Sequence, residues 1–184
     1  MTACNFEDLA ALKKEFFRIS RNLKCPPDFF PSLNKNLVYV PMNDLTVVSA
    51  TENCYCVGTS DLTSCAGIAI YDPDTKVGGV AHISFNPEIE GYITPVRGFQ
   101  FSRFSDYADR LISTAGKNGG NKYLFYAFNI GNGCRTQSQN SLLTEIVKTT
   151  VDQWQEKEKI IGFEYRDERA FLLNTKTGDI LPNL

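Results

Sequence analysis

Apolar residues recur along the chain at two different spacings, which predict helices in some segments and strands in others. Between residues 6 and 22 the apolar side chains occupy every third or fourth position, which is typical of one face of an amphipathic helix. The same spacing predicts helices over residues 105–115 and 141–154. Three prolines between residues 25 and 31 end the first helix and begin a connector, because proline fixes φ and lacks a backbone donor.

Short runs rich in Val, Tyr or Leu occupy much of the remaining chain, separated by Pro, Asn, Asp or Glu. The predicted strands are 37–40, 45–48, 54–57, 76–85, 123–130, 160–165 and 170–174. Because strands outnumber helices and mostly follow each other closely, the pattern predicts an α+β sandwich of largely antiparallel β-sheet with flanking helices. We expect an N-terminal helix and proline-rich connector over residues 1–36, followed by one domain over 37–184.

Length and charge narrow the classes of function. A chain of 184 residues with 42% hydrophobic and 22% charged residues has the composition of one globular domain. A net charge of −2 provides no positive field for phosphates, so we expect no nucleic-acid partner. No apolar run reaches the roughly 18 residues that would span a bilayer, and charges interrupt any signal-peptide core. We therefore expect no membrane insertion and a cytoplasmic location, or secretion into a host cell by a route without a signal peptide.

The cysteines do not follow the spacing of a metal site. They are Cys4, Cys25, Cys54, Cys56, Cys65 and Cys134, and the chain has one histidine, His82. A single histidine excludes a zinc site of the Cys2His2 type, and the one-residue gap between Cys54 and Cys56 is shorter than the usual spacing of zinc ligands. We expect no metal ion, no cofactor and, in a reducing compartment, no disulfides. Most of these thiols are expected to be small buried hydrophobic groups.

The glycine-rich segment 116–121 invites comparison with a phosphate-binding loop. It lacks the Gly-Lys-Ser/Thr pattern that would follow a strand in such a loop, and it comes directly after a predicted helix. Glycine at that place predicts a helix C-cap.

The segment from residue 58 to residue 85 contains a cysteine and a histidine with the chemistry of a nucleophile and a base. A polar loop precedes Cys65, and small residues follow it, so the thiol is predicted where the loop enters a buried element. If that element is a helix, Thr63 or Ser64 is its N-cap, and free backbone N–H groups would favour the thiolate and bind an oxyanion. The segment also fits a strand, and the sequence leaves both alternatives open. His82 lies in a predicted strand after the Gly78-Gly79 pair.

The same segment contains an ungapped series of short motifs. These are Thr59, Leu-Thr-Ser-Cys at 62–65, Ile-Tyr-Asp-Pro at 70–73 and Lys-Val-Gly-Gly-Val-Ala-His at 76–82. In this pattern the chain resembles the CheD family of bacterial chemoreceptor glutamine deamidases. The separations of 6 residues from Thr59 to Cys65 and 17 from Cys65 to His82 match the family's. The resemblance is closest over 58–85 and extends over 37–181, so it implies a CheD-like deamidase domain.

The resemblance implies a protein-glutamine deamidase that needs no metal or organic cofactor. By similarity, Cys65 would attack the side-chain amide of a glutamine on a protein substrate, and His82 would transfer protons. Thr59 would orient the imidazole, and backbone N–H groups near Ser64 and Cys65, with Thr63 beside them, would bind the oxyanion. A regulatory protein partner is also compatible with the resemblance.

Two differences from the family concern the substrate. The first 36 residues have no counterpart, and residues 86–103 are interpreted as an altered or lengthened loop. These differences favour a substrate other than a chemoreceptor, for example a host protein attacked by a bacterial effector. The alternatives are a thiol protease or transglutaminase, which share the acyl-thioenzyme stage, and a non-catalytic protein-binding adaptor of the same fold.

Overall fold

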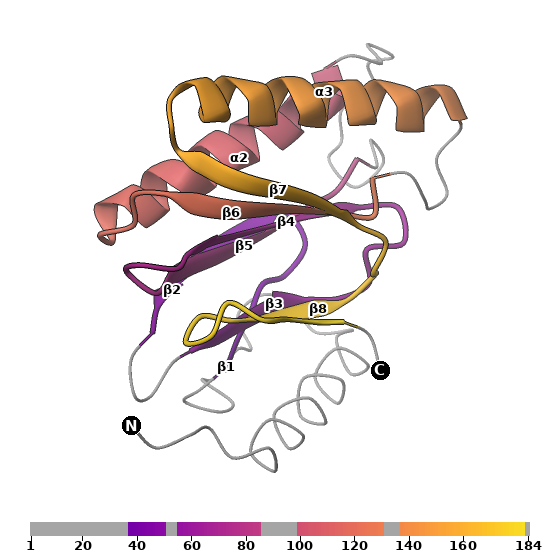
Figure 1. The fold of residues 1–184 in the computed structure, drawn as a ribbon. Coiled ribbons are helices and arrows are strands. Elements are labelled where there is room, and N and C mark those ends of the chain that lie inside the picture. The colour runs from indigo at the N-terminus through magenta and orange to yellow at the C-terminus, as the bar shows by residue number, and fades with distance from the viewer. Residues whose placement is uncertain (1–36, 51–54, 86–98, 131–136, 183–184) are drawn as a thin grey trace.

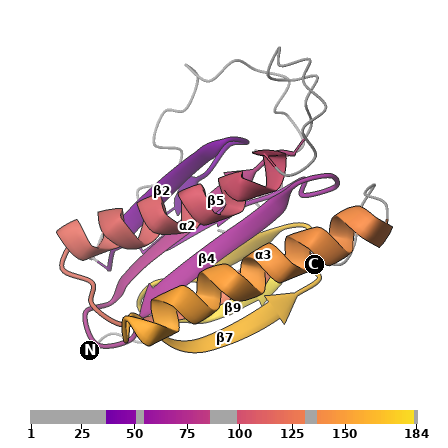
Figure 2. The same ribbon diagram turned by 90° about the horizontal axis from the view of Figure 1, so that it is seen from above.

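The structure is a computed structural model that describes residues 37–50, 55–85, 99–130 and 137–182. These residues form three layers. Two helices form one outer layer, a five-stranded sheet lies in the middle, and a four-stranded sheet forms the other outer layer (Figure 1). The helices are α2 (Phe99–Lys117) and α3 (Gln137–Glu156), which lie side by side over the five-stranded sheet (Figure 2).

The five-stranded sheet has the order β2-β5-β4-β6-β7. Its strands are β2 (Asp44–Ser49), β4 (Ala66–Asp72), β5 (Val77–Ile83), β6 (Tyr123–Phe128) and β7 (Ile160–Arg166). Every residue of β4 and β5 is buried, because one face of these strands packs against the helices and the other against the second sheet. The centre of the molecule is therefore the β4–β5 hairpin.

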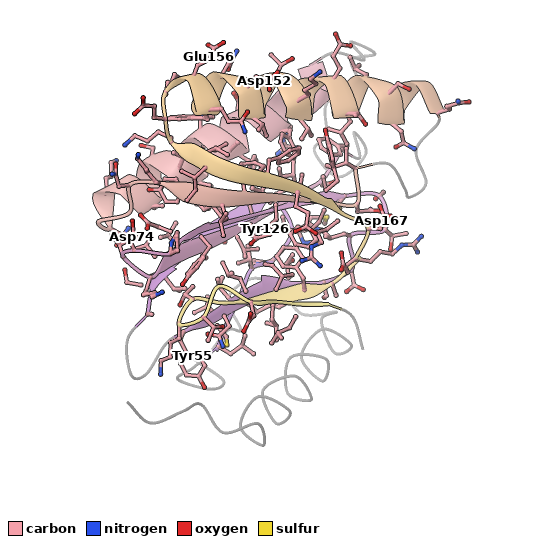
Figure 3. The ribbon with its side chains drawn as sticks, viewed as in Figure 1. Tyr55, Asp74, Tyr126, Asp152, Glu156 and Asp167 are labelled. Carbon is pink, nitrogen blue, oxygen red and sulfur yellow. The ribbon has the colours of Figure 1, made fainter. Side chains whose placement is uncertain are left out.

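The four-stranded sheet has the order β1-β3-β8-β9. Its strands are β1 (Leu37–Tyr39), β3 (Cys56–Thr59), β8 (Phe171–Asn174) and β9 (Ile180–Pro182). Between the sheets lies an apolar cluster in which the rings of Phe128 and Phe171 stack with centroids 3.6 Å apart. Figure 3 shows Tyr126 between the two sheets, whereas Asp152 and Glu156 point outward from α3.

The turn between β4 and β5 fixes the register of the hairpin. The Asp72 carboxylate, 1% exposed, accepts the N–H groups of Asp74 and Thr75 in this turn and of Asn121 and Lys122 before β6. Burial alone would raise the pKa of Asp72, but these four donors hold it below its ordinary value. With Asp72 opposite Val77 across the turn, every later pair in the hairpin is determined.

The α+β fold predicted from the sequence is confirmed. Five of the seven pairings between the described strands are antiparallel; β1–β3 and β6–β7 are parallel. The predicted glycine C-cap is also present, because Gly119 has a φ of 93° just after α2 and the Gly120 N–H bonds the Ala115 carbonyl at 2.9 Å.

Two further predictions concern the segment before α2 and the N-terminal segment. The predicted loop over 86–103 is wrong at its end, since α2 already begins at Phe99. The predicted helix over 6–22, and with it the division at residue 36, lies outside the described residues.

Candidate functional site

The hairpin register brings Cys65 and His82 to the same face of the five-stranded sheet. Gly67 pairs with His82, and Cys65 lies two residues before Gly67, immediately ahead of β4. Alternate residues of a strand share a face, and diagonal neighbours in a ladder have Cα atoms about 7–8 Å apart, so the register brings Cys65 close to His82 on one face. Both side chains belong to the space between the two sheets, and each is 3% exposed.

Thr59 reaches His82 from the opposite sheet. Its Oγ1 lies 2.8 Å from His82 Nδ1 and 2.8 Å from the Val40 carbonyl oxygen. The hydroxyl has a single proton, which it donates to the carbonyl, so it must accept the proton of Nδ1. The neutral imidazole is therefore the Nδ1–H tautomer, with the lone pair on Nε2. Thr59 thus lies against His82; that it orients the imidazole during a reaction, as the family resemblance implies, stays a prediction.

The Nε2 atom of His82 is buried and has no hydrogen-bond partner among the described residues. Burial lowers the pKa of His82 from 6.5 to about 4, so the side chain is neutral at physiological pH. An unsatisfied buried acceptor is costly, and such atoms in folded proteins call for an explanation, a catalytic role among them. Its lone pair is suited to accept a proton from a nearby donor.

The loop that leads to Cys65 is not the start of a helix. Cys65 is followed directly by β4, so the alternative in which Thr63 or Ser64 caps a helix is wrong. Thr63 is exposed and Ser64 half-buried in a bend before the strand. The strand forms because small and β-branched residues fill a position that is covered on both faces.

Asn129, at the end of β6, holds this loop in place. Its side-chain amide donates to the Leu62 carbonyl and, at 2.9 Å, to the Cys65 carbonyl. Its own φ is 55°, a conformation that asparagine tolerates better than most residues, and its backbone N–H bonds the Arg166 carbonyl at 2.8 Å. Both ends of the Leu62–Cys65 loop are thereby tied to the neighbouring strand.

Met42 lies directly over the thiol. Its Sδ is 3.9 Å from Cys65 Sγ, and its side chain is 42% exposed. Residue 42 belongs to the turn that carries the chain from β1 in one sheet to β2 in the other. Neither Met42 nor Asn129 was predicted from the sequence, where an isolated Met after a proline and an Asn at a strand end carry no distinctive signal.

Two surface pockets of the described residues lie apart from Cys65, His82 and Thr59. A pocket of about 500 Å³ on α2 is lined by Arg103, Asp106, Tyr107, Asp109 and Arg110. A smaller one of about 190 Å³ lies near the end of β7. Within the described ranges, no group of three or more His, Cys, Asp or Glu side chains could bind a metal ion. No helix in those ranges combines the length and apolar character needed to cross a membrane.

Comparison of the chain with models of known protein families and with curated proteins found no match. The chemistry of the site is therefore argued from its residues.

The burial of His82 predicts a loss of stability in mild acid. Between pH 6.5 and about 4 the unfolded chain binds a proton on His82 that the folded protein does not, so stability falls as the pH drops through this window. The loss should approach about 3 kcal/mol, and above pH 6.5 this group should have no further effect. Urea unfolding at several pH values between 7 and 4 measures it.

His82→Gln is the matched variant, because glutamine can donate to Thr59 but does not titrate. Carboxylates also gain protons in this range, so the difference in slope between the two proteins isolates His82. Equal pH dependence in the two proteins would contradict a buried, neutral imidazole.

A second prediction concerns Asn129. Asn129→Gly keeps the positive φ but leaves the Leu62 and Cys65 carbonyls without their donor, which should lower the free energy of unfolding by about 1–3 kcal/mol. Asn129→Asp has the same shape but brings a carboxylate against two carbonyl oxygens, so its loss should be larger. Urea unfolding of the three proteins at pH 7 gives the order, and an Asp variant as stable as the wild type would rule out the hydrogen bonds described.

Proposed function

We propose that the chain is a cysteine-dependent protein-glutamine deamidase, with Cys65 as nucleophile, His82 as general base and acid, and Thr59 as the residue that orients His82. The proposal depends on one observation: a buried imidazole, with Nδ1 bonded to Thr59, has its Nε2 lone pair unused on the face of the sheet that also carries a cysteine thiol. The resemblance to the CheD family, over residues 58–85, supports the same assignment.

The first half of the reaction forms a thioester. The Cys65 proton moves to His82 Nε2 as Sγ bonds to the amide carbon of the target glutamine. In the tetrahedral intermediate the former carbonyl oxygen carries the negative charge. When the intermediate collapses, the carbon–nitrogen bond breaks, and the imidazolium gives its proton to the nitrogen, which leaves as ammonia.

The second half hydrolyses the thioester. Neutral His82 takes a proton from water while the oxygen attacks the thioester carbon. The carbon–sulfur bond then breaks, Sγ recovers the proton from the imidazolium, and the product is a glutamate side chain. Because burial lowers the pKa of His82 to about 4, the imidazole is neutral at pH 7 and begins each half of the cycle as the free base.

The oxyanion is assigned to backbone N–H groups of the Leu62–Cys65 loop. Across a trans peptide the C=O and N–H groups point in opposite directions, so a fixed Leu62 carbonyl also fixes the direction of the Thr63 N–H. Asn129 holds this carbonyl together with that of Cys65. The loop is thus preorganised without a helix dipole, with Thr63, Ser64 and Cys65 as the candidate donors.

The proposed reaction adds one negative charge to a protein partner, which can alter an interface in the way other charge-changing modifications do. Thiol chemistry of this kind favours a reducing compartment, so we place the activity in the cytoplasm of the producing cell or, for an effector, of a host cell. The 36 residues before the domain and the segment after β5 favour a target other than a chemoreceptor.

Substrate capture with Cys65→Ala, followed by mass spectrometry of the captured proteins treated with wild-type protein, tests the proposal. We expect one glutamine to gain about 1 Da with release of ammonia, and no change with Cys65→Ala, because the thioester cannot form. Backbone cleavage would identify a thiol protease, and a cross-link to an amine a transglutaminase. Binding without any covalent change in the captured proteins would identify an adaptor.

Thr59 should affect turnover mainly through its hydrogen bond to His82. Thr59→Ala removes the acceptor of the Nδ1 proton, so kcat should fall about 10-fold to 100-fold, at or below the roughly 10²- to 10⁴-fold expected for losing a general base. Thr59→Ser keeps the hydroxyl and should remain close to the wild type. Equal kcat values in the two variants would show that the hydrogen bond does not orient the imidazole.

A further inference from the structure

The thiol that the proposed reaction needs is nearly closed off. Cys65 is 3% exposed, whereas the thioether that touches it belongs to a side chain that is 42% exposed. Three large apolar side chains are exposed among the described residues: Met42, Ile161 and Tyr165. Ile161 and Tyr165 both lie on β7. Met42 is thus an apolar surface group positioned directly at the nucleophile.

The backbone that carries Met42 is held by several hydrogen bonds. Asn43 donates its N–H to the His82 carbonyl at 2.8 Å, and its side-chain oxygen accepts the Ser84 N–H at 3.0 Å. The Tyr107 hydroxyl donates to the Asn43 carbonyl at 2.7 Å. On the other side of the turn, the Val40 carbonyl accepts the Thr59 hydroxyl.

These bonds leave the side chain of Met42 as the movable part. Methionine has three rotatable bonds beyond its backbone and a polarizable sulfur that adapts to different neighbours. Rotation about these bonds moves the thioether away from the Cys65 sulfur without breaking the hydrogen bonds of the turn given above. Movement of the backbone would disturb both Thr59 and His82.

We propose that Met42 is the gate and a specificity-determining residue of this site: its thioether covers Cys65 at rest and turns aside to pack against the aliphatic stem of the incoming glutamine. The identity of the substrate in this inference rests on the proposed function, whereas the contact of Met42 with Cys65 is independent of it. The two methylene groups of glutamine give the thioether an apolar surface to contact, while the amide proceeds to the sulfur. A terminal carboxylate or ammonium that had to pass the thioether into this buried site would lose its hydration, which disfavours acidic and basic side chains.

Alkylation by iodoacetamide tests the gate, because this reagent carries a primary carboxamide and needs no deamidase activity. In Met42→Ala the rate at Cys65 should rise about tenfold, which corresponds to a cover held closed by about 1.4 kcal/mol. Met42→Leu keeps a side chain of similar bulk and should react at close to the wild-type rate. Peptide mass mapping assigns the rate to Cys65.

Cys56, a fully buried thiol on β3, is the internal control for loss of structure. It should stay slow in all three proteins, and the thermal midpoint of Met42→Ala should stay near that of the wild type. An unchanged rate at Cys65 in Met42→Ala would overturn the gate. Equal acceleration in the Ala and Leu variants would overturn it too, since bulk would then not be what protects the sulfur.

The deamidation assay separates the two proposals. If Met42 contacts the substrate, Met42→Ala should raise KM for the captured protein more than it lowers kcat. Faster alkylation with no deamidation of any captured protein would uphold the gate and reject the deamidase. Deamidation with wild-type KM in Met42→Ala would uphold the deamidase and reject Met42 as a specificity residue.

Discussion

The hydrogen bond between Thr59 and His82 is the interaction on which the site depends, because it joins the two sheets of the sandwich at the imidazole. Thr59 comes from the four-stranded sheet and His82 from the five-stranded sheet. The Thr59 hydroxyl donates its only proton to the Val40 carbonyl in a hydrogen bond. Toward Nδ1 of His82 the threonine can therefore only accept. One short chain of hydrogen bonds therefore determines the tautomer, the ring orientation and the position of the lone pair.

Burial has opposite consequences for the two groups of the proposed site. It keeps His82 neutral, and so able to accept a proton, but it also removes the Cys65 sulfur from solvent. An exposed pair would be accessible at the cost of competing water, whereas the two side chains of this pair are each only 3% exposed. The apolar packing around it, including the stacked Phe128 and Phe171 rings, makes the local environment rigid.

The parts of the site that the sequence predicts are those that depend on local pairing. The turn after Asp72 and the 17 residues from Cys65 to His82 belong to one hairpin, so their relation follows from strand geometry. Thr59 came from the resemblance to a family, since the spacing alone does not say which sheet it joins. Asn129 and Met42 contact Cys65 from 64 and 23 residues away, and no periodicity encodes such contacts. Helix and strand could not be separated for the run after Cys65, because a strand buried on both faces lacks alternation.

The four N–H groups gathered by Asp72 lie at the end of the hairpin remote from Cys65 and His82. Strand alignment is thus anchored at one end of the sandwich, and the proposed reaction belongs to the other end, where the connections following β5 and β6 leave the sheet. Those connections can change in length or composition over evolution without shifting the sulfur relative to the ring. Such a division of labour would allow the proposed reactive centre to be redirected to new target proteins.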